Sequence, residues 1–397
     1  MFINRNKYIN NKFFMELALA QAQKNLGNTK ENPAVGCVLV KNGHLISAGY
    51  TGEGGRPHAE QNAINFSQDN PRKSELYVTL EPCSHYGKTP PCTKLIMKNK
   101  IKKVFFSIND PDPRSFNKCS SIFNRKGIAV SNHILKSKVD FFYRSYIKNK
   151  KDNLPFVTCK LAVSKDFFAI NKKNKWITNE LSRGRVHLMR SFNECIITSS
   201  ETINKDNPRL SCRINGLYNT SPSVVILDRK LKIHTNSRII NKSKKERVII
   251  FYNENNKEKI KLLKKLKIKT YKISLDRSGN LDLKESLIKT KKLGFSRIFI
   301  EAGIKLSNSF LKKGLVDDFK LFLSNEKLGK NGRDNIKNFF VKYLKNKTKI
   351  VEKVNLSSDK LISYKIKYCL AELLKTQEKS EVFIKKIITV ILKYIRK

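Results

Sequence analysis

Four residues near the start of the chain have the types and spacing of a catalytic metal site. His58-Ala59-Glu60 is followed by Pro82-Cys83 and, after eight more residues, by Cys92. One imidazole and two thiolates can hold zinc and leave its fourth position open for water. Zinc lowers the pKa of that water toward neutrality, and Glu60 can carry protons between the water and a departing amine. The pattern is the H-x-E…P-C signature of zinc deaminases of bases.

A structural zinc site, or a non-catalytic zinc scaffold that binds polyanions, is the alternative interpretation. Structural zinc normally has four protein ligands and no free acid beside it. Cys119 is a candidate fourth ligand, but it lies beyond a proline-rich turn in a polar segment. The free carboxylate of Glu60 therefore favours catalysis.

The stretch between the two cysteines narrows the class of deaminase. Deaminases of nucleosides or nucleic acids commonly have Pro-Cys-x-x-Cys, whereas Ser-His-Tyr-Gly-Lys-Thr-Pro-Pro separates Cys83 from Cys92 here. This insertion resembles that of the bifunctional riboflavin-biosynthesis deaminase–reductase family. Asn-Pro-Ala-Val-Gly-Cys-Val at 32–38 and Asp-Pro-Asp-Pro at 110–113 fit the same family, which more usually has Asn at the third place of the second motif.

The resemblance implies a phosphorylated pyrimidine as the small-molecule substrate, 2,5-diamino-6-(5-phosphoribosylamino)pyrimidin-4-one. Three residues are candidates for holding its base and its ribose phosphate: Asn32, His85 and Lys88. Lys88 suits the phosphate better than acid–base work, because an exposed lysine stays charged near neutral pH.

The second half of the chain carries further motifs of this family, and the resemblance extends from Phe13 to Tyr368. They are Leu-Ala-Val-Ser-Lys-Asp at 161–166, Trp-Ile-Thr at 176–178, Val-His-Leu-Met-Arg at 186–190, Asp-Asn-Pro-Arg-Leu-Ser-Cys-Arg at 206–213, Leu-Asp at 227–228 and Ile-Glu-Ala-Gly at 300–303. Gly-x-Gly-x-x-Gly is missing, so an ordinary Rossmann site is not indicated. The resemblance implies a dihydrofolate-reductase-like fold that uses NADPH to reduce the ribosyl group to a ribityl chain.

Site residues of the reductase follow from the resemblance, position by position. The cofactor-contacting places are Ala162, Trp176, Thr202, Asp206 and Gly303, and the substrate-contacting places are Lys160, Asn174, Arg190, Leu210, Arg213 and Glu301. Two arginines suit a phosphate, because the guanidinium fork pairs with two of its oxygens. The chain departs from the family at Phe167, where Gly usually follows Asp166, and in the shortened loop up to Trp176. A deaminase that has lost its reductase activity is therefore a further alternative.

The elements around these motifs predict an α/β fold, with a cytidine-deaminase-like zinc domain followed by the reductase. In the first unit we expect helices over 14–26, 58–66 and 92–96, strands over 36–40, 45–49, 76–80 and 104–108, and a helix that opens near Cys83. Asn42-Gly43 between two apolar runs is a strong hairpin signal. Glu60 then lies in a first helical turn, where the dipole favours a carboxylate, and a helix N-terminus at Cys83 would favour its thiolate.

A charged linker at 148–153 separates this unit from a second one. There we expect strands over 156–162, 194–198, 223–227, 247–252 and 297–301, and helices over 179–191 and 285–293. We assign residues 1–147 to the deaminase, 154–370 to the reductase and 371–397 to a basic amphipathic tail with an isoleucine stripe. Docking of the tail on the reductase, or self-association into a homo-oligomer, is favoured over binding to an anionic membrane.

Composition narrows the setting in which the protein works. No run of eighteen apolar residues occurs, the N-terminus lacks a secretory pattern, and eight cysteines in 397 residues suggest no disulfide framework. We therefore expect a cytoplasmic protein without a transmembrane segment. The net charge of +48 comes from lysines spread along the chain, which favours a solvated surface over a specific nucleic-acid site.

A deaminase of nucleic acid or free nucleotide, with the C-terminal unit as a non-catalytic binding module, is the competing function. The basic charge supports it. The eight-residue gap between the cysteines and the reductase motifs argue against it.

Overall fold

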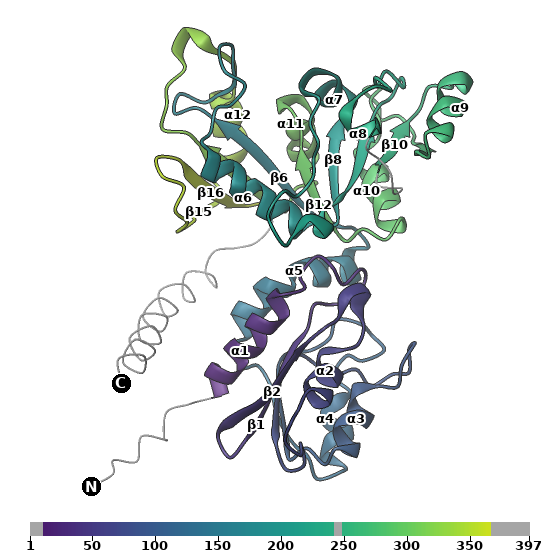
Figure 1. Cartoon of the computed structure of the whole chain (residues 1–397), viewed down its shortest axis with the longest axis vertical. Helices are drawn as coiled ribbons and strands as arrows, with labels where there is room; N and C mark the ends of the chain where they lie inside the picture. Colours follow the sequence, from purple (N-terminus) through teal and green to yellow (C-terminus); the bar gives the residue numbers. More distant parts are fainter. Residues whose placement is uncertain (1–10, 242–247, 367–397) are drawn as a thin grey trace. The chain divides into compact units, whose positions relative to one another are not determined.

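The computed structural model describes residues 11–241 and 248–366, apart from the side chains of residues 340 and 341. The chain divides into two compact units, with the boundary between Lys151 and Asp152 (Figure 1). Each unit is a mixed α/β layer structure with its own sheet. No helix among these described residues is long and apolar enough to cross a membrane.

The first unit is built on a five-stranded sheet with the order β2-β1-β3-β4-β5. Its strands are β1 (Gly36–Lys41), β2 (His44–Tyr50), β3 (Glu75–Leu80), β4 (Lys103–Ile108) and β5 (Ala129–Ser131). Strand β1 runs antiparallel to β2 and β3, while β3, β4 and β5 are parallel. The helices are α1 (Asn11–Gln23), α2 (Ala59–Asn65), α3 (Cys92–Lys98), α4 (Cys119–Asn124) and α5 (Lys136–Asp152).

Alternation along the strands gives this sheet two apolar faces. Val38, Tyr77 and Phe105 pack with α1 residues in one core cluster, and neighbouring strand residues pack with α2, α3 and α4 in another. Helix α1 lies so close to β1 that a Cβ on Gly36 would stand 1.8 Å from the carbonyl oxygen of Ala18. Glycine is therefore required at this contact.

The second unit contains a nine-stranded sheet with the order β11-β10-β9-β8-β12-β6-β13-β16-β15. Its strands are β6 (Phe156–Val163), β8 (Cys195–Ser199), β9 (Ser223–Leu227), β10 (Val248–Tyr252), β11 (Lys269–Lys272), β12 (Arg297–Glu301), β13 (Asp318–Leu323), β15 (Thr348–Val351) and β16 (Lys360–Lys365). The run from β11 to β13 is parallel, and β16 and β15 are antiparallel additions. Strands β7 (Phe168–Asn171) and β14 (Gly332–Asn335) form a separate pair.

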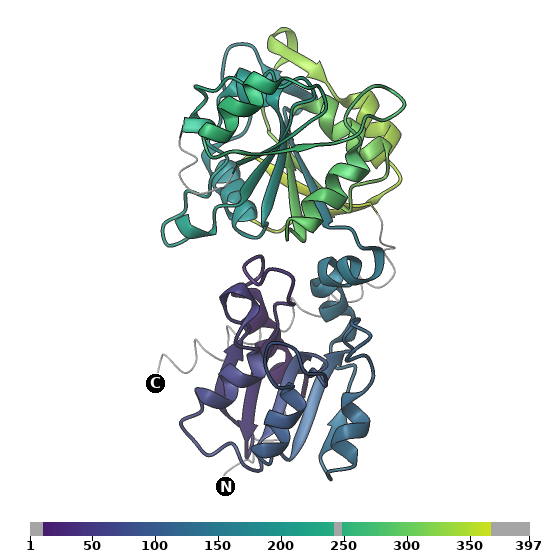
Figure 2. The same cartoon turned by 90° about the vertical axis from the view of Figure 1, so that its right-hand side faces the viewer.

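Helices cover both faces of this sheet (Figure 2). They are α6 (Glu180–Ser191), α7 (Ser200–Asp206), α8 (Arg238–Asn241), α9 (Lys257–Lys265), α10 (Leu283–Lys292), α11 (Ile304–Lys312) and α12 (Lys337–Leu344). The central strands are continuous buried apolar runs, such as Val224 to Leu227 in β9. That is the pattern of a parallel sheet whose two faces are both covered.

Most of the elements expected from the sequence are present. The Asn42-Gly43 hairpin is confirmed, with both residues at positive φ. The helix expected to open near Cys83 is wrong, because Cys83 lies in irregular chain and the next helix begins at Cys92. Residues 148–152 of the expected linker continue α5. The tail at 371–397 lies outside the described residues.

Candidate active sites

Three side chains of the first unit converge on one point. His58 is the N-cap of α2, Cys92 is the first residue of α3, and Cys83 follows β3. Their ligand atoms all lie within 4.8 Å of one another, and His58 Nδ1 is 3.3 Å from Cys92 Sγ and 3.6 Å from Cys83 Sγ. Zinc with ordinary bond lengths and tetrahedral angles requires an N–S separation of about 3.5 Å. These three residues therefore fit a zinc ion, and Cys119 is not among the group.

The thiol of Cys83 is prepared for metal binding by its neighbours. Hydrogen bonds from Cys92 and from His58 lower the pKa of Cys83 to about 4. The amide N–H of Cys92, at the start of α3, donates to Cys83 Sγ at 3.2 Å. A helix N-terminus therefore does stabilise the Cys83 thiolate, as the sequence suggested, but it belongs to the helix that starts nine residues later. Zinc binds cysteine as the thiolate.

Glu60 lies in the first turn of α2 and is 4% exposed. Burial raises the pKa of this carboxyl to about 7, although the charge of His58 opposes the shift. A carboxyl with a pKa near the working pH can both accept and donate a proton. The position and the environment of Glu60 thus suit a general acid–base.

Asn32 lies against the chain that leads into the zinc ligands. Gly55, three residues before His58, has φ +93, and a Cβ there would stand 2.2 Å from Asn32 Nδ2. The backbone at Gly55 therefore leaves room for the Asn32 amide only because residue 55 has no side chain. This contact brings Asn32 next to the metal-binding segment.

The insertion between the two cysteines carries His85 and Lys88. His85 Nδ1 is 2.9 Å from Ser115 Oγ, and burial, followed by the charge of Arg114, lowers the pKa of His85. Lys88 is exposed on the same loop. A hydrogen bond from Arg56 Nη1 to Thr89 Oγ1 ties the loop to the segment before His58.

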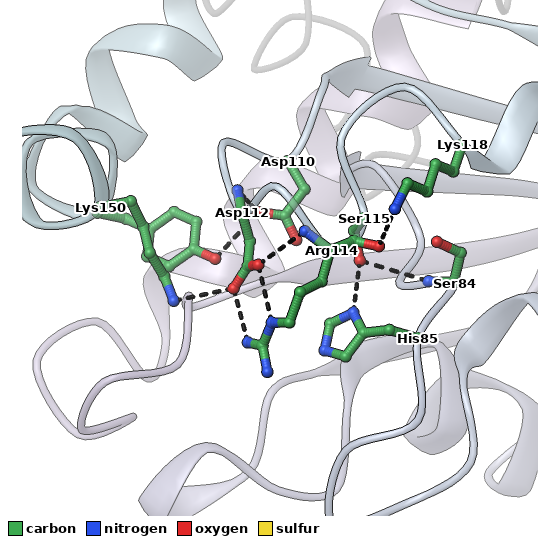
Figure 3. Close-up of polar contacts among 9 residues, drawn as sticks. Ser84, His85, Asp110, Asp112, Arg114, Ser115, Lys118 and Lys150 are labelled. Atoms are coloured by element: carbon green, nitrogen blue, oxygen red, sulfur yellow. Dashed lines mark hydrogen bonds and ion pairs between the residues drawn. The ribbon is translucent and has the colours of Figure 1, made fainter.

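In the loop after β4, the sequence showed the Asp-Pro-Asp-Pro motif at 110–113 but not the contacts that the loop makes. Glu81 is only 2% exposed. Its carboxylate accepts hydrogen bonds from four backbone N–H groups between β4 and the start of α4, those of Asp110, Asn117, Lys118 and Cys119. Asp112 binds Arg114 of the same loop and Lys150 in the last turn of α5 (Figure 3). The sequence contains a signal for the pairing of Asp112 with Arg114, because the acid and the arginine stand on either side of a single proline.

In the second unit, several predicted residues lie at the carboxyl ends of neighbouring parallel strands. Ala162 is near the end of β6, Glu301 ends β12, and Thr202 lies in the first turn of α7 after β8. Gly303 is the N-cap of α11, and a Cβ there would meet nothing within 4 Å. Ligands of open parallel sheets bind outside these strand ends.

A buried ion pair links the substrate-contacting candidates. Arg190 Nε and Nη2 donate to the two carboxylate oxygens of Glu301, at 2.9 and 2.6 Å. Lys160 is paired with Glu301 in the register of β6 and β12, and burial lowers the pKa of Lys160 while Glu301 opposes that shift. Arg190 Nη1 donates to the carbonyl oxygen of Ser211 at 2.9 Å.

Two more candidates adjoin this cluster. Leu210 is 3% exposed and has φ +47, directly before Ser211. The pKa of Arg213 is lowered by partial burial and then by the charges of Arg190 and Arg209, so a group of arginines gathers here. An anion is the natural ligand for such a group.

The structure does not join the remaining three candidates to this cluster. Among the described residues, Asn174, Trp176 and Asp206 make no hydrogen bond or ion pair with Lys160, Arg190 or Glu301. Trp176 is 55% exposed, with the Arg183 guanidinium over its ring. Their roles rest on the family resemblance alone.

Residues 155–355 match the family described as RibD C-terminal domain, and residues 9–108 match the cytidine and deoxycytidylate deaminase zinc-binding region. The chain is therefore a fusion of a zinc-binding deaminase domain with a reductase domain. The deaminase-like and reductase-like fold classes expected from the sequence are confirmed.

Relatives of the whole chain define the family. The riboflavin biosynthesis protein RibD of Bacillus amyloliquefaciens is 32% identical over 79% of this chain and 84% of its own length, and that of Aquifex aeolicus is 33% identical over 80% and 88%. Two solved structures are similar. Acinetobacter baumannii RibD is 29% identical, with a TM-score of 0.77, and the match covers 90% of this chain and 99% of that one. A Thermotoga maritima protein is 30% identical, with a TM-score of 0.76, and the match covers 89% of this chain and 98% of that one. The chain belongs to the RibD family of bifunctional deaminase–reductases of riboflavin biosynthesis.

Proposed function

We propose that the first unit deaminates 2,5-diamino-6-(5-phosphoribosylamino)pyrimidin-4-one and that the second unit then reduces the ribosyl group with NADPH. The observation that carries the proposal is the convergence of His58, Cys83 and Cys92 within 4.8 Å, next to the buried acid Glu60. The Thermotoga maritima relative is described as a diaminohydroxyphosphoribosylaminopyrimidine deaminase and 5-amino-6-(5-phosphoribosylamino)uracil reductase. We further propose that the protein works in the cytoplasm, where its cysteines stay reduced.

In the deamination, bound zinc would supply an activated water. Glu60 accepts a proton from the attacking water and delivers it to the amine that leaves the pyrimidine as ammonia. A pKa of about 7 lets the same carboxyl perform both transfers. Asn32 and His85 hold the base and the ribose, and Lys88 meets the phosphate.

In the reduction, NADPH would supply a hydride to C1′ of the opened ribose. The strand ends fit this cofactor, because Gly303 leaves open space at the start of α11 and Thr198 Oγ1 at the end of β8 is buried without a hydrogen-bond partner among the described residues. Ala162, Thr202, Asp206 and Trp176 are the further residues that we propose to contact it.

Substrate contacts in the reductase are proposed at Lys160, Asn174, Arg190, Leu210, Arg213 and Glu301. Arg190 uses three of its donors within the protein, so it supplies mainly a fixed positive charge, and Arg213 is the freer partner for the phosphate. Lys160, whose pKa is lowered by burial, is the residue that we propose to supply the proton that accompanies the hydride.

Glu60→Gln tests the proposal. We expect ammonia release to fall by at least about 100-fold, with zinc content unchanged and NADPH-dependent reduction of the deaminated intermediate intact. Glu53→Gln, at an exposed position of the same unit, is the matched control and keeps both activities. Ammonia release retained by Glu60→Gln would sink the assignment, and zinc-loaded wild-type protein without turnover would favour a non-catalytic zinc scaffold.

A further inference from the structure

An arginine outside the expected substrate site lies beside the zinc-binding segment. The hydroxyl of Ser115 is 2.9 Å from His85 Nδ1 and accepts from the backbone N–H of Ser84 at 3.4 Å. These contacts join the loop after β4 to the two residues that directly follow Cys83. Arg114 precedes Ser115, so the same contacts bring it to the edge of the deaminase site.

Asp112 fixes the guanidinium of Arg114 in one orientation. Its Oδ1 accepts from Arg114 Nε at 2.9 Å and its Oδ2 from Nη2 at 2.7 Å. The Asp112 side chain is only 7% exposed, and Lys150 Nζ holds it from the other side at 3.0 Å. A bidentate pair of this kind sets both the position and the plane of the guanidinium.

The other edge of this guanidinium is free. The Arg114 side chain is 61% exposed, and Nη1 donates to no acceptor in the described part of the chain. Figure 3 shows the Arg114 guanidinium and the His85 imidazole projecting to the same side of the two loops. The unused donors of Arg114 therefore face the space next to His85.

The charges of the group favour an anion. The two acids of the group, Asp112 and its neighbour Asp110, are buried, whereas the side chains of the cations Arg114 and Lys150 are more exposed, so the positive charge lies on the solvent side. Lys88, on the loop that carries His85, adds another cation. Because the acid is buried and the guanidinium is exposed, an incoming anion meets the positive side of the pair.

We propose that Arg114, held by Asp112, binds the phosphate of the deaminase substrate and sets the preference of this half of the enzyme for a phosphorylated pyrimidine. The inference rests on the proposed function of the first unit. Asp112 acts here as a positioning residue, because it touches the arginine and not the substrate.

The test compares the substrate with its dephosphorylated form in Arg114→Met and in a matched control. Arg125→Met removes the same charge from an exposed position at the end of α4. For Arg114→Met we expect kcat/KM on the phosphorylated substrate to fall about 10- to 100-fold, mostly through KM, as for loss of a charged hydrogen-bond pair. Activity on the dephosphorylated substrate stays within about twofold of wild type, and inhibition by inorganic phosphate weakens.

Two further variants separate positioning from folding. Arg114→Lys keeps the charge and recovers part of the loss, and Asp112→Asn raises KM for the phosphorylated substrate alone because the guanidinium is no longer fixed. An equal loss on both substrates in Arg114→Met, or an equal effect of Arg125→Met, overturns the inference while the deaminase assignment stands. Wild-type protein that releases no ammonia from either substrate overturns both proposals.

Discussion

Glu301→Gln removes the carboxylate that, among the described residues, pairs with Arg190, and it should destabilise the second unit strongly. The Arg190 and Glu301 side chains are 10% and 15% exposed, so water replaces little of what is lost. At a charge separation of about 4 Å and an effective dielectric constant of about 20, the lost attraction is about 4 kcal/mol. The amide NH₂ also turns one accepting atom into a donor that faces an N–H of Arg190. We therefore expect a loss of about 3–5 kcal/mol, typical of breaking a buried pair from one side.

Urea unfolding followed by tryptophan fluorescence measures this loss in the right unit. Trp176 is the only tryptophan of the chain, so the signal reports the second unit alone. With a urea dependence of roughly 2–3 kcal/mol per M, the midpoint should fall by about 1–2 M.

The double variant Arg190→Met/Glu301→Gln gives the decisive comparison. The double variant has no buried guanidinium that could be left unpaired. Its loss in free energy of unfolding should therefore be smaller than the sum of the losses of the two single variants. A midpoint shift below about 0.3 M for Glu301→Gln, or strictly additive losses, would refute the claim that the pair is buried and mutually dependent.

Two more predictions follow from local geometry. Gly55→Ala should raise KM for deamination while leaving reduction of the deaminated intermediate unchanged, because the new Cβ would stand 2.2 Å from Asn32 Nδ2. Steady-state kinetics of each half-reaction measure the effect. Gly127→Ala, at φ +68 in open space, is the control for backbone strain. Burial, and then the charges of Arg190 and Arg213, lower the pKa of His187 to about 4. Between about pH 6.5 and 4 this histidine is therefore protonated in the unfolded chain but neutral in the folded one, so the free energy of unfolding decreases as the pH falls. His187→Asn should reduce the difference between the urea midpoints at about pH 7.5 and 5.5, and an unchanged difference would contradict the shift.

Local motifs made the zinc site predictable from sequence, and distant contacts limited the rest. His58, Glu60 and Cys92 lie at the starts of two helices whose apolar spacing is visible in the sequence. A helix was expected to open near Cys83, where its N-terminus would favour the thiolate, but the stabilising N–H comes from Cys92. Nothing in the local pattern shows that the helix whose N-terminus reaches Cys83 begins only at Cys92.

The pairing of charges was the least predictable part of the sites. Arg190 and Glu301 are separated by 111 positions, and the resemblance assigned each to the substrate without showing that they bind one another. Phe167 was noted as a departure from Gly, and the structure shows why Gly is usual there: its φ is +66, a conformation that costs an L-residue about 1–2 kcal/mol. The Phe167 side chain packs against the main core of the second unit, which offsets that cost.

The two units use the same electrostatic arrangement at their proposed phosphate sites. Asp112 lies between Arg114 and Lys150 in the first unit, and Glu301 lies beside Arg190 and Lys160 in the second. In each group a poorly exposed acid orients cations without cancelling their charge. Neither proposed reaction removes the substrate phosphate, so both proposed sites meet a phosphorylated substrate. The dispersed net charge of +48 cannot supply recognition of that phosphate, because charges separated by more than about 8 Å are screened at physiological salt, whereas a fixed guanidinium fork in direct contact is screened far less.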